Sequence, residues 1–292
     1  MNAHGQGRHT DSFKERRERS YALHQESQIV GMDGDIKVIT EWILKEDSPP
    51  VIAVVGMGGQ GKTLLLQHVF KNEHISQRFD HKVWLAISQK FDVVELLCQV
   101  LREFEPNFNS KNLNKGELIE QIHKNLEGKR CLFAVDDVWD RDAWNDIGLP
   151  SRIQDMVVLT TRDEAVAKDM KAQIHRKISL SSDMSWKLFC IHAFSDDALH
   201  ACPEELDKIA HSIVEKCAGN PLAIKTIGAY LARHVRGLPN DWEWTLLHLH
   251  EAYGMSDRVL SSLKLSYEAL PSHLKPCFLY CSVFPKNTQI DT

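Results

Sequence analysis

The chain has 292 residues, of which 43% are hydrophobic and 26% are charged, and this composition excludes a wholly disordered chain. Lys and Arg number 35 against 40 Asp and Glu, so the net charge is −5 and bulk charge gives no indication of nucleic-acid binding. Apolar runs such as residues 51–55 are far shorter than the roughly 20 residues that cross a bilayer, so no membrane span is expected.

Cysteine usage and the first residues indicate the compartment. The seven cysteines are scattered and include no CxxC pair, and the N-terminus lacks the apolar core of a signal peptide. We therefore expect a reducing, cytoplasmic location, with no disulfide framework and no zinc site.

Residues 1–26 are polar and show no sustained helical periodicity, which predicts a flexible arm or linker. The run Lys14–Arg19 suggests a basic arm for nucleic acid as the alternative, but Glu15 and Glu18 interrupt it.

A helix is expected next, with Asp33 as its cap and with Ile36, Ile39 and Ile43 on one face. The segment Asp47–Pro50 ends it, because the two prolines cannot continue a helix.

Short apolar runs without alternation then recur, as in buried parallel strands, at 51–55, 83–87, 131–135 and 156–159. Helical patterns separate them at 64–71, 92–104 and 115–127. This alternation predicts an α/β fold with a doubly wound parallel sheet. After about residue 180 only helical patterns follow, which predicts an all-helical domain with helices at 183–194, 203–217, 221–234, 241–250 and 256–270.

The strongest motif is Gly-Met-Gly-Gly-Gln-Gly-Lys-Thr at 56–63, which fits G-x-x-x-x-G-K-[ST] between an expected strand and an expected helix. Glycines let the backbone wrap closely round phosphate oxygens, and the positive helix end faces the anion. Lys62 can reach the β- and γ-phosphates, and Thr63 can offer its hydroxyl to Mg²⁺. The alternative is a glycine-rich turn with an exposed lysine. The predicted nucleotide-binding residues here are Gly56, Gly58, Gly59, Gln60, Gly61, Lys62, Thr63 and Leu64.

Two acidic residues follow the third expected strand, at the edge of the sheet where the phosphate loop lies. Asp136 can hold Mg²⁺ directly or through water, and Asp137 can orient an attacking water. The alternative is a pair of solvated loop acids. At the end of the fourth strand, Arg162 can sense the γ-phosphate charge, with a surface arginine as the alternative.

These motifs, in this order, resemble the NB-ARC nucleotide-binding module of plant intracellular disease-resistance proteins of the NLR class, from about Gln28 to the end. The fold that the resemblance implies is a P-loop NTPase domain, a helical domain and the first part of a winged-helix domain. Because Trp139 follows the acidic pair, the chain resembles the coiled-coil branch of that family more than the other branches. The matching segments are Ile29–Asp33, 56–63, Phe79–Trp84, Leu132–Trp139, Thr160–Arg162, Trp186–Phe189, Lys216–Leu222, Leu263–Tyr267 and Cys277–Pro285.

The resemblance implies roles for residues that spacing alone does not assign. Val30 and Gly31 match the segment whose backbone contacts adenine, and Pro221 matches the proline of the family's GLPL turn, which packs near the base. The match also supports Arg162 as a sensor of the γ-phosphate. The implied cofactors are ADP or ATP with Mg²⁺. In the implied switch, bound ADP holds the domains closed and ATP releases them.

The chain also departs from the family pattern. Asn220 replaces the usual leucine of GLPL, which keeps the turn and adds polarity near the base. No counterpart of the family's coiled coil, Met-His-Asp motif or leucine-rich repeats is present, so a truncated receptor is expected. The expected domains are an arm at 1–26, the nucleotide-binding domain at 27–182, the helical domain at 183–252 and an incomplete winged-helix segment at 253–292.

Three functions remain open at this point. The first is an ADP/ATP switch in plant defence, with at most slow Mg²⁺-dependent hydrolysis. The second is an autonomous P-loop NTPase. The third is an interaction fragment that pairs with full-length NLR receptors or with itself through an exposed apolar patch around Leu274 and Phe278. Cys277 and Cys281 have a spacing that can bridge a metal, but their apolar neighbours favour core thiols.

Overall fold

The computed structural model of the protein describes residues 29–87, 91–108, 113–140, 144, 145, 147, 155–194, 200–234, 239–251, 263, 264, 267, 268 and 270–284. The arm predicted at 1–26 lies outside these residues, as does most of the helix predicted at 256–270.

A five-stranded parallel sheet forms the first half of the molecule, with the strand order β2-β3-β4-β1-β5. The four predicted strands are confirmed as β1 (Val51–Val55), β2 (His81–Ala86), β3 (Cys131–Val138) and β4 (Met156–Thr161). The edge strand β5 (Gln173–Arg176) was not predicted, because it pairs only with β1, is at most half-buried and contains a single apolar residue. The fold class predicted from the strand–helix alternation is confirmed.

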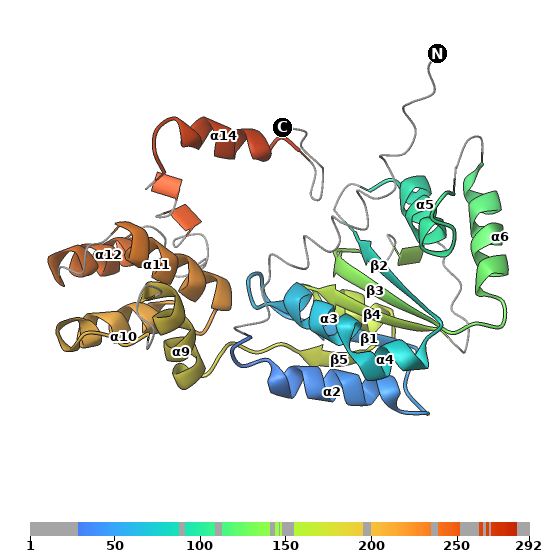
Figure 1. Ribbon diagram of the computed structural model, residues 1–292, viewed down its shortest axis with the longest axis horizontal. Coiled ribbons are helices and arrows are strands. Elements are labelled where there is room, and N and C mark those ends of the chain that lie inside the picture. Colours follow the sequence, from blue (N-terminus) through green and yellow to red (C-terminus); the bar gives the residue numbers. More distant parts are fainter. Residues whose placement is uncertain are drawn as a thin grey trace, which may run out of the picture.

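Successive residues of the central strands point to opposite faces of the sheet, and each face has its own core (Figure 1). Ile52, Val54 and Leu132 pack against α2 (Asp33–Leu44), α3 (Lys62–Lys71) and α4 (Glu73–Arg78). Ala53, Phe133 and Leu159 pack on the other face, where α5 (Val93–Phe104), α6 (Lys115–Leu126) and α8 (Glu164–Asp169) lie. Burial on both faces explains why these strands read as continuous apolar runs.

Side-chain caps fix where the covering helices begin. Asn72, Asp92 and Asp163 accept hydrogen bonds from the first backbone N–H groups of α4, α5 and α8, and Asn114 forms a capping box with Glu117 on α6.

The cap predicted for α2 is wrong. Met32 is the N-cap residue and makes no side-chain cap, while Asp33 is already the first helical residue. Gly31 turns the chain with a φ of 72°, which moves the start of the helix one residue earlier. Asp33 still lies in the first turn, where a negative charge favours the positive helix end.

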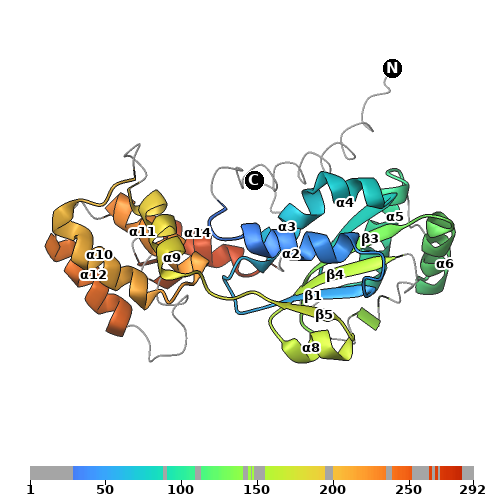
Figure 2. The ribbon, with the colours of Figure 1, turned by 90° about the horizontal axis from the view of Figure 1, so that it is seen from below.

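The second half of the described chain is a helical bundle with a separate core (Figure 2). It contains α9 (Ser182–Ala193), the 3₁₀ turn η2 (Glu204–Leu206), α10 (Asp207–Lys216), α11 (Pro221–His234) and α12 (Pro239–Glu251). Phe189 is fully buried at its centre and meets the rings of Phe194 and Trp242 edge-on. These aromatic contacts tie α9 to α12.

The helix α14 (Leu274–Cys281) has no buried residue. The expected apolar patch comprised Leu274, Phe278, Leu279 and Phe284. The first three are 41%, 58% and 54% exposed, as expected, whereas Phe284 is half-buried. The expectation that Cys277 and Cys281 are core thiols is wrong, because both cysteines are exposed. Their apolar neighbours face outward with them, so the apolar pattern that predicted burial has no described core to join.

A buried charge cluster ties α2 to the strand edge next to the phosphate loop. The Asp35 carboxylate lies 2.8 Å from Nζ of Lys177, whose side chain is 2% exposed, and 2.8 Å from Nε2 of His175. The backbone N–H of Lys177 also donates to the carbonyl of Val55, at the end of β1. The cluster therefore holds the start of α2 beside the loop that leaves β1.

The Asp35→Ala variant is expected to lose about 3 kcal/mol of unfolding free energy, because it leaves the Lys177 charge buried without its carboxylate. Urea unfolding followed by circular dichroism measures the loss. Asp33→Ala is the matched control on the same turn, where an exposed carboxylate contributes only about 0.3–1 kcal/mol. Equal losses in the two variants would contradict a structural role for the buried cluster.

Candidate nucleotide-binding site

The loop at 56–61 leaves the carboxyl end of β1 and leads directly into α3. Gly59 and Gly61 have φ values of 77° and 83°, which side-chain-bearing residues rarely adopt. A Cβ atom at Gly56 would collide with the side-chain oxygen of Gln60, and one at Gly58 would lie 3.4 Å from the Arg162 guanidinium. Backbone conformation therefore favours glycine at positions 59 and 61, and close approach favours it at position 56, whereas position 58 has room for a Cβ atom.

Lys62 and Gln60 are both buried inside the loop. The Lys62 ammonium donates to the carbonyl of Met57 at 2.9 Å, and the Gln60 side-chain oxygen accepts from the N–H of Met57 at 2.7 Å. These bonds close the loop on itself and hold the lysine over it. The ammonium is thus placed where a phosphate bound by the loop would meet it.

The Asp136 carboxylate accepts hydrogen bonds from hydroxyl groups on two other elements. The Thr63 hydroxyl on α3 donates to both carboxylate oxygens, at 2.8 and 3.1 Å, and the Thr160 hydroxyl on β4 donates at 2.7 Å. The Asp136 residue is 5% exposed. Three elements therefore converge on one buried carboxylate at the carboxyl edge of the sheet.

Asp137 sits in an irregularity of β3, where the register with β4 shifts between Val135 and Val138. Its φ is 61°, a left-handed conformation that Asp tolerates better than most residues, and its N–H donates to the Thr160 hydroxyl at 2.8 Å. A bulge of this kind redirects side chains at the end of a strand. Asp136 consequently contacts Thr63 and Thr160, while Asp137 lines the cavity and lies beside Arg162.

Arg162 follows β4 and faces Asp137. Its Nε lies 3.6 Å from the Asp137 carboxylate, and its guanidinium lies 4.9 Å from the ring centre of Trp139. Half of the arginine side chain remains exposed, so its charge is available to a bound anion.

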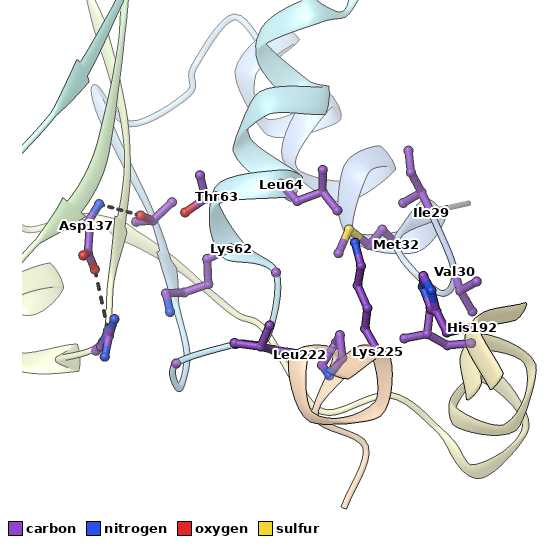
Figure 3. Close-up of a pocket in the computed structure, with 17 residues that line it drawn as sticks. Ile29, Val30, Met32, Lys62, Thr63, Leu64, Asp137, His192, Leu222 and Lys225 are labelled. Atoms are coloured by element: carbon purple, nitrogen blue, oxygen red, sulfur yellow. Dashed lines mark hydrogen bonds and ion pairs between the residues drawn. The ribbon is translucent and has the colours of Figure 1, made fainter. Parts of the chain in front are cut away.

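A cavity of about 350 Å³ lies between the sheet and the helical bundle (Figure 3). Lys62, Thr63 and Asp137 lie at one end of the hollow, and Ile29, Val30 and Met32 lie at the other. Lys62 and Arg162 supply positive charge near the carboxylate of Asp137, while Lys225 and His192 lie toward Met32 and Val30 (Figure 3). A net positive end and a largely apolar end together fit a nucleotide, whose phosphates are anionic and whose base has flat apolar faces.

Most of the predicted site residues line this cavity, namely Val30, Gly58, Gly59, Gly61, Lys62, Thr63, Leu64, Asp137, Arg162 and Pro221. The others lie just behind the lining. Gly56 and Gln60 shape the loop from within, Asp136 is covered by Thr63, and Gly31 is the turn residue next to Val30.

The sequence did not single out Met32, Leu188, His192, Leu222 and Lys225, which also line the cavity. Leu188 and His192 come from α9, and Leu222 and Lys225 come from α11, so both helices contribute side chains one turn apart. Residues three or four apart share a helix face, so this spacing predicts further lining residues only when one residue of the helix is already assigned to the site. Lys225, one turn after Pro221, could have been found in this way.

The arrangement of the sheet, loop and bundle defines a P-loop NTPase fold. The chain is similar to a STAND ATPase with a tetratricopeptide-repeat sensor from Pyrococcus horikoshii, with a TM-score of 0.54 and 16% identity over 89% of this chain and 35% of that one. It is also similar to the ORC2 protein of Aeropyrum pernix in ADPNP–ADP complexes, with a TM-score of 0.55 and 14% identity over 85% of this chain and 74% of that one. Both likenesses concern the fold.

The chain belongs to the NB-ARC domain family, whose model matches residues 32–199. It is 37% identical over 286 residues to the disease resistance RPP13-like protein 4 of Arabidopsis thaliana, covering 93% of this chain and 33% of the relative. It is 33% identical over 288 residues to the Arabidopsis thaliana disease resistance protein RPM1, covering 92% of this chain and 30% of the relative. The chain spans about a third of the length of the curated relatives it matches.

Two further observations concern the described residues alone. No helix among them is both long and apolar enough to span a bilayer. No group of three or more His, Cys, Asp or Glu side chains among them could hold a metal ion.

His192, which lines the cavity, makes folding stability depend on pH. Burial and the nearby positive charge of Lys225 lower the pKa of His192 below its ordinary value of 6.5, so the folded protein protonates this ring less readily than the unfolded chain does. The unfolded chain binds a proton more readily, and folding stability therefore falls as the pH drops below about 6.5.

When the pH falls from about 7.5 to about 5, the melting temperature of the His192→Asn variant is expected to decrease less than that of the parent protein, because asparagine does not titrate. Thermal unfolding of both proteins across this range is the measurement. Melting curves that shift in parallel would mean that another group dominates the acid response.

Proposed function

We propose that the chain is an ADP/ATP-binding switch module of a plant immune receptor that acts in the defence response. The observation that carries the proposal is the glycine-rich loop, whose Lys62 and Thr63 face a cavity closed by the helical bundle. A nucleotide in that cavity touches both halves of the molecule, so its phosphate content can bias how the two halves sit together. The family and the disease-resistance relatives support the biological setting.

Each part of the ligand has a matching part of the site. The loop from Gly56 to Thr63 holds the phosphates through backbone N–H groups and the Lys62 ammonium. Val30, Leu64 and Pro221 surround the base, and Gly31 provides the turn that brings Val30 to it.

The oxygen ligands around Asp136 fit Mg²⁺, which prefers carboxylate, hydroxyl, phosphate and water oxygens. The Thr63 hydroxyl and the Asp136 carboxylate are 2.8 Å apart, so the two protein groups already lie together. When bound, the ion would neutralise charge on the phosphates. Thr160 keeps the carboxylate in position from the other side.

Asp137 and Arg162 are the residues that we assign to the γ-phosphate. Asp137 can orient a water molecule, and the Arg162 guanidinium can bind the γ-phosphate, which ATP carries and ADP lacks. Their ion pair across 3.6 Å gives each a partner before any phosphate arrives, and Asp is a short carboxylate for water activation. We therefore propose hydrolysis slower than about 1 s⁻¹, the lower end of ordinary enzyme turnover.

The proposed boundary between the first two domains follows the division between the two cores of the sheet and the core of the bundle. The nucleotide-binding domain extends over 27–182 and the helical domain over 183–252, with a winged-helix segment at 253–292. The described chain passes from β5 to α9 through Lys177–Ser181, beside the phosphate loop, so a rotation of the bundle about this segment would open or close the cavity.

Protein purified without added nucleotide and then denatured is expected to release close to one equivalent of ADP. The Lys62→Ala variant is expected to release essentially none, because it loses the ammonium that faces the phosphates. Chromatography of the released nucleotide measures both, and phosphate release from the same preparation measures hydrolysis.

Lys71→Ala is the matched control, since Lys71 is exposed at the other end of the same helix and should leave the ADP content unchanged. Empty, folded parent protein would contradict the proposed switch. Turnover above about 1 s⁻¹ that depends on Lys62 would instead indicate an autonomous NTPase.

A second candidate function is self-association or binding to full-length NLR receptors, and the exposure of α14 favours it. Phe278, Leu279, Tyr280 and Val283 are 54–73% exposed and lie within two turns of one another. Exposed apolar groups of this density commonly mark protein interfaces.

If α14 mediates self-association, the parent protein should sediment faster as its concentration rises, and Phe278→Glu should abolish that dependence by placing a charge in the patch. Val94→Glu, at a partly exposed apolar residue of α5, is the control and should behave like the parent. A parent protein that stays monomeric at all concentrations would exclude self-association. Binding to an immobilised full-length NLR receptor would then be the interaction left to test.

A further inference from the structure

Asn220 connects the helical bundle to the phosphate loop by side-chain and backbone hydrogen bonds. Its amide nitrogen donates to the carbonyl of Gly58 at 2.9 Å, and two residues later the N–H of Leu222 donates to the carbonyl of Gly59 at 3.2 Å. Both bonds connect the two domains, because Gly58 and Gly59 lie in the loop before α3, whereas Asn220 and Leu222 lie at the start of α11. We refer to these two bonds between the four residues as the clasp.

The orientation of the Asn220 side chain is determined by its other partners. Its side-chain oxygen accepts from the N–H of Leu222 at 3.0 Å and from the N–H of Ala223 at 3.2 Å, and so caps α11. Because two N–H donors face the oxygen, the amide nitrogen must face the Gly58 carbonyl. The residue is also only 9% exposed, so both ends of its side chain are used in a nearly closed environment.

The contact between the loop and α11 depends on glycine at position 59. A Cβ atom there would lie 2.7 Å from the Asn220 side-chain oxygen and 2.8 Å from Cβ of Leu222. Any side chain at this position would therefore push the bundle away from the loop. The turn before α11 is equally tight, since Ala218 and Gly219 have φ values of 48° and 69°.

The clasp acts on the flexible part of the loop. Gly58 and Gly59 have no side chains, so their peptide planes rotate more easily than those of residues with side chains. Each plane is rigid and carries a carbonyl on one side and an N–H on the other. The two bonds of the clasp hold the carbonyls of Gly58 and Gly59, and they therefore also fix the direction of the N–H groups of Gly59 and Gln60, which belong to the proposed phosphate-binding backbone.

We propose that Asn220 is a positioning residue that holds the phosphate loop in its binding conformation and makes nucleotide retention depend on contact with the bundle. This inference rests on the proposed function of the site and adds the residue that couples its two halves. Pre-setting the loop reduces the cost of ordering it when phosphate binds. Since coupling is reciprocal, bound nucleotide must tighten the clasp by the same factor by which the clasp tightens nucleotide binding.

The test separates the clasp from ordinary helix capping. Asn220→Ser keeps an oxygen that can cap α11 but is too short to reach the Gly58 carbonyl, and Asn220→Leu removes both interactions. Asn114→Ser is the matched control, because Asn114 caps α6 in the same way and contacts no part of the cavity. Circular dichroism of each variant establishes that it is folded.

Hydrogen exchange of the protein stripped of nucleotide is the first measurement. Asn220→Ser is expected to speed exchange in residues 57–61 as well as in residues 220–224, while Asn114→Ser changes neither. Faster exchange confined to 220–224 would mean that Asn220 is only a helix cap, and it would overturn the proposal. Because this measurement needs no bound nucleotide, it decides on the clasp even if the chain does not retain ADP.

The dissociation rate of a fluorescent ADP analogue is the second measurement. Loss of one hydrogen bond that sets the loop is expected to raise the rate about 3- to 10-fold in Asn220→Ser. An unchanged rate in both Asn220 variants would overturn the link to retention. Failure of the parent protein to bind the analogue would instead count against the proposed function of the site.

Discussion

The buried carboxylate of Asp136 is the interaction on which the rest of the site depends. It sits at the end of β3 and accepts hydrogen bonds from Thr63 on α3 and Thr160 on β4. These contacts require β3 and β4 to end, and α3 to begin, at one edge of the sheet, which the parallel strand order provides. The phosphate loop, the acidic pair and Arg162 acquire their relative positions from this convergence.

Much of this arrangement was predictable because buried parallel strands leave a clear pattern. The runs at 51–55 and 131–135 are apolar on both faces, and the residues that follow them must lie at the same edge of the sheet. The phosphate loop adds glycines at a spacing that is characteristic of anion binding between a strand and a helix. Position along a strand was therefore enough to locate Lys62, Asp136 and Arg162 at that edge.

Features that depend on contacts between distant segments were not predictable. The strand β5 is polar, and it is held by its pairing with β1 and by side-chain contacts of His175 and Arg176 with distant helices, so it carries no pattern of its own. His192 and Lys225 reach the cavity because the bundle packs against the loop, and nothing near them in the sequence says so. Asn220 was recognised as unusual, but its bond to Gly58 spans 162 residues of sequence. The exposure of Cys277 likewise depends on what packs on α14, and the local apolar pattern predicted the opposite.

The left-handed backbone of Asp137 has a consequence for how this site can evolve. A φ of 61° is tolerated by Asp and Asn but is strained for most longer side chains. A longer side chain such as glutamate at this position would cost about 1–2 kcal/mol in backbone strain unless the bulge in β3 changed with it. The length of the carboxylate at position 137 and the conformation of the bulge are therefore coupled, and a substitution of one changes the conformational energy of the other.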